Sequence, residues 1–184
     1  SEMCIRDRCN NCDPDLDATR ATIQEMDLDG SGMTPKARHI RNAIALATNP
    51  QTAALWAGVA GQDELPHGHP YEIFDPVTLH PGVPDYGWPY CYENHQAVGG
   101  HDCKAQTVAR VVMPAYATPI GAAFYPAHPS GAHAFPEAYR GGAFVTLHGS
   151  WHQPPVPPRV VFIAMNGDEP QTAVDWNDPA TQWK

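Results

Sequence analysis

Short apolar segments separated by proline and glycine turns constrain the fold of this chain more than any other feature of its sequence. The segments recur roughly every ten to fifteen residues, and their β-branched and aromatic side chains favour strands. The 20 proline and 15 glycine residues among 184 also favour short strands joined by turns over a helical domain. We therefore predict the all-β class. The expected strands lie in residues 38–47, 53–60, 107–114, 120–125, 143–147 and 159–165, with a short element in residues 71–79.

Three turns are predicted at Asp27-Leu28-Asp29-Gly30-Ser31-Gly32, Asn49-Pro50 and Asn166-Gly167. The first is similar to the start of an EF-hand calcium loop, but the twelfth position falls on Arg38, where that loop requires a glutamate. We interpret it as a polar hairpin turn. The interval between strands does not distinguish a β-propeller from a β-sandwich, because both contain short strands at this spacing.

A rigid loop is predicted for residues 85–91, Asp-Tyr-Gly-Trp-Pro-Tyr-Cys. Glycine and proline within so few residues exclude a helix interior. Taken alone, the Gly-Trp-Pro sequence has two interpretations. It is either a structural corner or a loop that presents aromatic side chains to a ligand.

Five short motifs follow one another in a specific order. They are Ile40-Arg41-Asn42-Ala43, Gln62-Asp63-Glu64-Leu65, Tyr86-Gly87-Trp88-Pro89-Tyr90, Gly121-Ala122-Ala123-Phe124-Tyr125, and Tyr139-Arg140-Gly141-Gly142-Ala143-Phe144-Val145 continued by Leu147-His148-Gly149-Ser150-Trp151. The order resembles the glucose/sorbosone dehydrogenase family, the soluble-type quinoprotein sugar dehydrogenases, and more closely its sorbosone-dehydrogenase-like branch. The resemblance spans about residues 9 to 167.

This resemblance implies a six-bladed β-propeller of several hundred residues. Residues 9–184 would then form a partial propeller domain, about two to three blades from the later half. We expect such a partial ring to be unstable alone, because blade edges and the central face stay uncovered. Residues 1–8 have no periodicity that connects them to the rest, and we interpret them as a foreign extension.

The resemblance also implies two cofactors, pyrroloquinoline quinone (PQQ) and calcium. Arg41 and Asn42 match the family's Arg-Asn pair, which donates hydrogen bonds to the quinone oxygen that gains charge. Thr118 approximates another cofactor contact. His148 stands where glucose-type members have a lysine, which leaves the choice of cofactor open.

Two tryptophans and one backbone segment complete the implied site. Trp88 and Trp151 are expected to line the face on which the quinone stacks, with ordinary core packing as an equal alternative. Gly58 and Val59 align with the segment whose backbone carbonyls hold calcium, although the family's Gly-Pro is Gly-Val here.

No catalytic residue is assigned in this chain, because the family's base lies farther upstream than the segment before Arg41 allows. The expected function is oxidation of a sugar or aldehyde by hydride transfer to PQQ in the full-length parent, with an external electron acceptor as a further partner. One alternative is a non-catalytic propeller that binds a ligand. Another is a carbohydrate-binding all-β module in which Trp88, Trp151 and Tyr90 form a stacking platform.

The chain has five cysteines, an odd number. With Cys4 set aside, the remaining four allow three pairings, of which the local one joins Cys9 to Cys12 and Cys91 to Cys103. Disulfides would indicate an oxidising compartment, so the expected location is periplasmic or secreted. Free thiols and a metal site remain as alternatives.

The net charge of −9 and the absence of a Lys/Arg cluster argue against nucleic acid as a partner. No segment approaches the ~20 consecutive apolar residues that a membrane helix needs. We therefore expect neither nucleic-acid binding nor a membrane span in this sequence.

Overall fold

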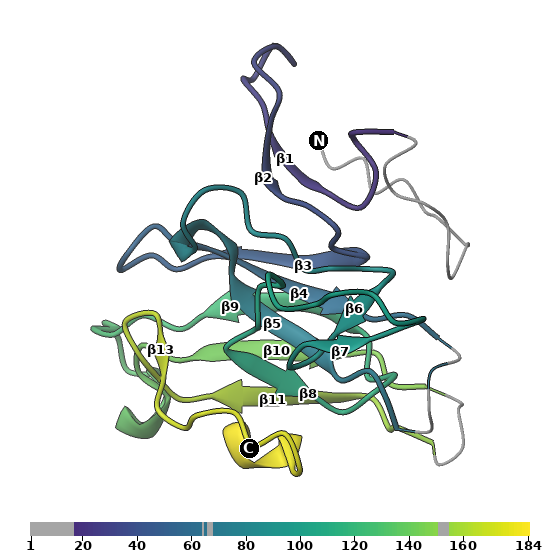
Figure 1. Ribbon diagram of the computed structural model, residues 1–184. Coiled ribbons are helices and arrows are strands. Elements are labelled where there is room, and N and C mark those ends of the chain that lie inside the picture. The colour runs from purple at the N-terminus through teal and green to yellow at the C-terminus, as the bar shows by residue number, and fades with distance from the viewer. Residues whose placement is uncertain (1–16, 64, 66–67, 151–154) are drawn as a thin grey trace.

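The computed structural model describes residues 17–63, 65, 68–150 and 155–184 (Figure 1). The described chain consists of short antiparallel strands and three 3-10 segments, and no α-helix occurs within these ranges. The predicted all-β class is confirmed. Within the described part of the chain, no helix has the length and apolar character that crossing a membrane requires.

The first sheet has four antiparallel strands in the order β3-β4-β5-β8. These strands are β3 (Asn42–Thr48), β4 (Leu55–Ala60), β5 (Glu72–Pro76) and β8 (Val111–Met113). A turn joins β3 to β4 at the predicted Asn49-Pro50 position, where the carbonyl of Asn49 accepts the Ala53 amide at 2.8 Å.

The second sheet has three antiparallel strands in the order β11-β10-β9. They are β9 (Pro119–Phe124), β10 (Ala143–Leu147) and β11 (Arg159–Ile163). Lys184 pairs with the outer edge of β11, because its backbone N–H and C=O both bond to Phe162, at 3.0 and 2.9 Å.

Short elements complete the described chain. The hairpin β1 (Ile23–Glu25) and β2 (Thr34–Ala37) encloses the predicted polar turn, and β12 (Met165–Asn166) with β13 (Glu169–Pro170) encloses the predicted Asn-Gly turn. Both turn predictions are confirmed. The others are β6 (Cys91–Tyr92), β7 (Gln96–Ala97), η2 (Val77–Leu79), η3 (Glu137–Tyr139) and η4 (Pro179–Gln182).

The main core lies between the two sheets. Trp56 of β4 contacts Phe74 of β5 and Phe124 of β9, with ring centroids 4.8 and 5.9 Å apart. Gly58 lets the sheets approach, because a Cβ there would lie 2.9 Å from the Cβ of Pro119. The strands β3 and β4 therefore pack face to face against β9, as Figure 1 also shows.

A second apolar cluster covers the opposite face of the first sheet. Ile23 and Ala37 come from the β1–β2 hairpin, Val59 from β4, and Ile40 and Tyr86 from the connections. The hairpin projects from the sheets at the top of Figure 1.

Residues 85–90 form the predicted loop, and Cys91 begins β6. The backbone of the loop bonds to the segment before β3, since Tyr86 N–H donates to Arg38 and Trp88 N–H donates to His39, at 3.0 and 2.9 Å. Gly87 has φ +81°, and a Cβ there would lie 2.5 Å from the Cβ of Cys91. A disulfide joins Cys91 to Cys103, with the Cα atoms 5.6 Å apart. The predicted partners Cys9 and Cys12 lie outside the described residues.

Several strands are shorter than the sequence predicts, for reasons that involve other segments. The backbone of Arg38 and His39 bonds to the 84–88 loop and the Ile40 amide bonds to the carbonyl of Ala21, so β3 begins only at Asn42. The segment before β8 also bonds outside the ladder, because Arg110 N–H donates to the Asp75 carboxylate at 2.8 Å. The six-bladed propeller, of which this chain would form two to three blades, stays a prediction.

Candidate functional site

Four residues predicted to bind the cofactor lie at one end of the two sheets. We call this end the strand-end edge: it is where β3, β5 and β9 begin and where β4, β8 and β10 end. Arg41 and Asn42 lie at the start of β3, Thr118 immediately precedes β9, and His148 immediately follows β10. The backbone N–H of His148 donates to the carbonyl of Thr118 at 3.0 Å, which joins two of these positions directly.

Arg41 is held from two sides. Its Nη1 donates to the carbonyl of Gly61, just beyond β4, and its Nη2 lies 3.2 Å from the carboxylate of Asp63. The side chain is only 12% exposed. Its Nε is buried and has no hydrogen-bond partner within the described ranges. This cation is therefore fixed by the chain, and its buried Nε–H donor is unused.

Glu72 is the buried carboxyl group of the edge, and the sequence analysis did not identify it. It is 3% exposed and accepts the backbone N–H of Gly61 at 2.6 Å. Burial raises its pKa to about 7, against the opposing effect of the Gly61 and Thr118 amides and the Arg41 charge. Its one sequence signal is a charged residue at the start of an apolar segment.

The connection from β8 to β9 has unusual backbone geometry. Tyr116 and Thr118 both have positive φ, at 62° and 52°, and this conformation is costly for a β-branched residue. Burial raises the pKa of the Tyr116 hydroxyl, and the charges of Asp63 and Glu72 raise it further. The Tyr116 hydroxyl therefore interacts electrostatically with both carboxyl groups.

His148 is exposed, and its Nδ1 lies 3.0 Å from the carbonyl of Gly149. Its ring is therefore oriented by the adjacent backbone and is accessible to solvent. Glu72 connects the two sides of this edge, because the amides of Gly61, which Arg41 also contacts, and of Thr118 both bond to its carboxyl group. The cationic and amide groups at this edge suit a ligand rich in carbonyl oxygens.

The two predicted calcium ligands lie inside a strand. Gly58 and Val59 belong to β4, and both pair with residues of β3 and of β5. Backbone carbonyls at interior ladder positions accept hydrogen bonds from neighbouring strands. Calcium binding by these two residues stays a prediction. It requires that their carbonyl oxygens are free of the hydrogen bonds between strands. Across the described ranges, no group of three or more His, Cys, Asp or Glu side chains is placed to hold a metal ion.

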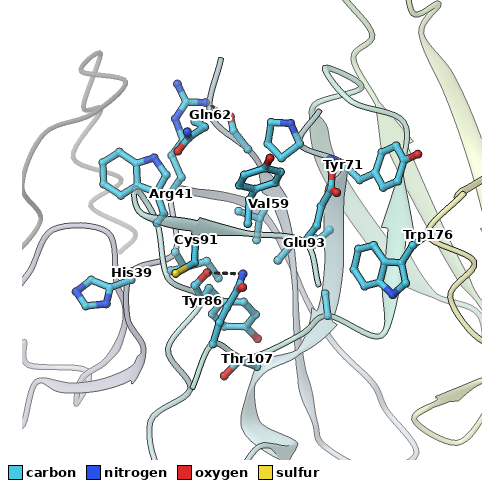
Figure 2. A pocket seen from close by; sticks show the side chains of 18 residues that line it. His39, Arg41, Val59, Gln62, Tyr71, Tyr86, Cys91, Glu93, Thr107 and Trp176 are labelled. Carbon is cyan, nitrogen blue, oxygen red and sulfur yellow. Dashed lines mark hydrogen bonds between the residues drawn. The ribbon is translucent and has the colours of Figure 1, made fainter. Parts of the chain in front are cut away.

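Trp88 lies beside the edge in the wall of a small pocket, and it is 7% exposed. The pocket has a volume of about 60 Å³ and is lined by aromatic and polar side chains (Figure 2). It is much smaller than the roughly 300–1,000 Å³ typical of ligand sites, so a tricyclic quinone does not fit inside it. Quinone stacking on Trp88 stays a prediction, and Trp151 lies outside the described residues.

No protein-family model matches the sequence, and no curated protein matches it either. Solved structures do match the fold. The holo form of the pyranose dehydrogenase PQQ domain from Coprinopsis cinerea matches with a TM-score of 0.73 and 16% identity, over 96% of this chain and 53% of that one. The iodide structure of the Trichoderma reesei carbohydrate-active enzyme of family AA12 matches with a TM-score of 0.72 and 17% identity, over 91% of this chain and 50% of that one.

A glucose dehydrogenase matches with a TM-score of 0.56 and 16% identity, over 84% of this chain and 44% of that one. The chain therefore spans about half the length of the solved structures that it matches. Its fold is similar to the matched parts of these structures, among them a pyranose dehydrogenase PQQ domain, which is consistent with the resemblance in the sequence.

Proposed function

We propose that this chain is part of a quinoprotein dehydrogenase that oxidises a sugar or an aldehyde, with PQQ and calcium as cofactors. One observation carries the proposal. Arg41, Asn42, Thr118 and His148 were selected from separate parts of the sequence, and they lie together at the strand-end edge. The likeness of the fold to a pyranose dehydrogenase PQQ domain supports it.

We also propose that the two sheets are neighbouring blades of a six-bladed propeller, and that residues 9–184 are its partial domain. Each sheet is built from antiparallel strands in chain order, and the first strand of the second sheet packs on the face of the first sheet. Adjacent propeller blades have this relation. The strand-end edge would then lie on one face of the propeller, with β3 and β9, the first strands of the two sheets, nearest its axis.

PQQ supplies a quinone that accepts hydride from the substrate when it is bound. The chain supplies orientation and charge. Arg41, held by Gly61 and Asp63, presents a cation that does not need to reorganise, and Asn42 adds an amide donor beside it. His148 and Thr118 would contact the cofactor from the second sheet. No residue of this chain is proposed as the base that removes the substrate proton.

Calcium binding is proposed on the resemblance in sequence, and the Trichoderma reesei AA12 enzyme has a calcium structure. A periplasmic or secreted location is proposed because Cys91 and Cys103 form a disulfide, which persists in oxidising compartments.

A non-catalytic propeller that binds a ligand is the second candidate. It is favoured by His148 in the position of the family's lysine. The carbohydrate-binding module is less well supported, because Trp88 is buried and does not form an exposed stacking platform.

The test is titration of the full-length protein with PQQ in calcium-containing buffer, followed by dye reduction with a panel of aldoses and aldehydes. We expect calcium-dependent binding and substrate-driven reduction. Arg41→Ala and Asn42→Ala should each weaken PQQ binding by about tenfold or more, since each removes a hydrogen bond to a charged oxygen. Arg140→Ala, at an exposed position near the opposite end of β10, is the matched control. A folded protein that binds no PQQ would exclude the dehydrogenase and leave the ligand-binding propeller.

A further inference from the structure

The small pocket beside the strand-end edge combines aromatic walls with hydrogen-bonding groups. Tyr71, Tyr86 and Trp88 contribute rings, and Glu93 and Gln106 contribute polar side chains. Figure 2 shows the side chains that line the pocket, with Arg41 and His39 on the left and Tyr71 and Trp176 on the right. Arg41, Gly61 and Gln62 also line it, so the pocket adjoins the edge that we propose for the cofactor.

Three side chains of this pocket carry a buried polar atom without a hydrogen-bond partner in the described chain. These atoms are the Nε of Arg41, the Nε1 of Trp88 and the Oε1 of Gln106. Gln106 is oriented by its own amide nitrogen, which donates to the carbonyl of Tyr86 at 3.2 Å. Buried polar groups without partners cost about 1–3 kcal/mol each. Two donors and one acceptor therefore remain to be satisfied around one cavity.

The size and chemistry of the pocket limit what it can hold. A cavity of about 60 Å³ is several times the roughly 10–15 Å³ that a single water molecule needs, so it admits only a short chain of a few atoms. A short hydroxylated chain fits this space. Each hydroxyl group can donate and accept, which matches the unused donors and acceptor, and C–H groups can pack on the rings.

We propose that this pocket binds the hydroxylated end of a sugar or polyol, through Trp88 and Gln106. The assignment of this ligand as the tail of the substrate rests on the proposed function. Binding of a polyol to the pocket does not, because it needs no quinone. The two polar atoms are shielded by the pocket wall, so we expect a small movement of Trp88 or Gln106 when a ligand enters.

The test is titration of the quinone-free, full-length protein with glycerol, with ¹⁵N-labelled tryptophan indoles observed by NMR. The Trp88 resonance is assigned by its loss in Trp88→Phe. We expect glycerol to shift this resonance, while 1-propanol, which carries one hydroxyl group, does so much less. Gln106→Met should weaken glycerol binding about threefold to tenfold, the effect of one hydrogen bond. Gln51→Met, at an exposed site outside the pocket, should leave it unchanged.

The outcomes separate this inference from the proposed function. A Trp88 resonance that does not shift up to molar glycerol, or a shift of equal size in Gln106→Met, overturns the inference. Glycerol binding without PQQ binding retains the polyol pocket and removes the dehydrogenase. If both bind, Gln106→Met in the PQQ-loaded protein should raise KM for an aldose with kcat unchanged. An unchanged KM would overturn the assignment to the substrate tail.

Discussion

Glu72 accepts the backbone N–H of Gly61 at 2.6 Å, and the carbonyl of the same glycine accepts Nη1 of Arg41. One backbone residue is thus held between a buried acid and a nearly buried cation. The Gly61 peptide consequently links the ionisation of Glu72 to the position of Arg41. The first of the following predictions tests Glu72, and the last tests Arg41.

Glu72 should make the stability of the protein depend on pH. Its pKa rises from 4.5 to about 7 in the folded state, because burial disfavours the charged form. Between these pH values the folded state binds more protons than the unfolded state, so the free energy of unfolding falls as pH rises. The loss should approach roughly 3 kcal/mol above pH 7.

Urea unfolding of the full-length protein and of Glu72→Gln at pH 4.5 and pH 8 measures this effect. The variant keeps a carbonyl acceptor for Gly61 and loses the ionisation, so its stability should fall less between the two pH values. Glu137→Gln, at an exposed position, is the control. An equal change in the free energy of unfolding between the two pH values in the wild type and in Glu72→Gln would contradict the prediction.

The Cys91–Cys103 disulfide should stabilise the protein by about 3 kcal/mol, because it closes a short loop in the unfolded chain. The double variant Cys91→Ser/Cys103→Ser should melt at a lower temperature, and so should the wild type after reduction. Dithiothreitol should have no further effect on the double variant. A wild-type melting temperature that is insensitive to reduction would count against this role.

Gly87→Ala should be more destabilising than Gly82→Ala. Both residues have positive φ, at 81° and 67°, so each alanine has a similar backbone cost of about 1 kcal/mol. Only at Gly87 would the added Cβ meet another atom, the Cβ of Cys91 at 2.5 Å, whereas no atom lies within 4 Å at Gly82. Gly87→Ala should therefore lower the free energy of unfolding by about 1–3 kcal/mol more than Gly82→Ala does. Equal melting temperatures of the two variants would show that the loop adjusts freely.

Arg41→Lys should weaken PQQ binding although it keeps the charge. Lysine cannot donate to Gly61 and contact Asp63 in the fixed geometry of a guanidinium group. We expect about a tenfold loss of affinity in a fluorescence titration. Arg140→Lys is the matched control. Unchanged affinity in Arg41→Lys would mean that charge alone is needed at this position.

Much of the local structure could be predicted from the sequence, because its causes are local. The polar turn between β1 and β2, the turn at Asn49 and the turn at Gly167 each follow from a few adjacent residues that favour such backbone angles. The rigid loop containing Gly87 follows from the same chemistry. Strand limits were less accurate, because the segments before β3 and β8 bond to distant residues such as Asp75.

The resemblance of five motifs selected Arg41, Asn42, Thr118 and His148, and only the tertiary structure decided that they lie at one edge. Their proximity depends on β9 of the second sheet packing against β3 and β4 of the first, which no local pattern encodes. Burial of Glu72 likewise depends on the second sheet packing against the first. The sequence by itself determined short strands, their turns and a set of candidate residues. Long-range packing determined which of these residues share a site, because side chains acquire their burial and their partners only when the sheets come together.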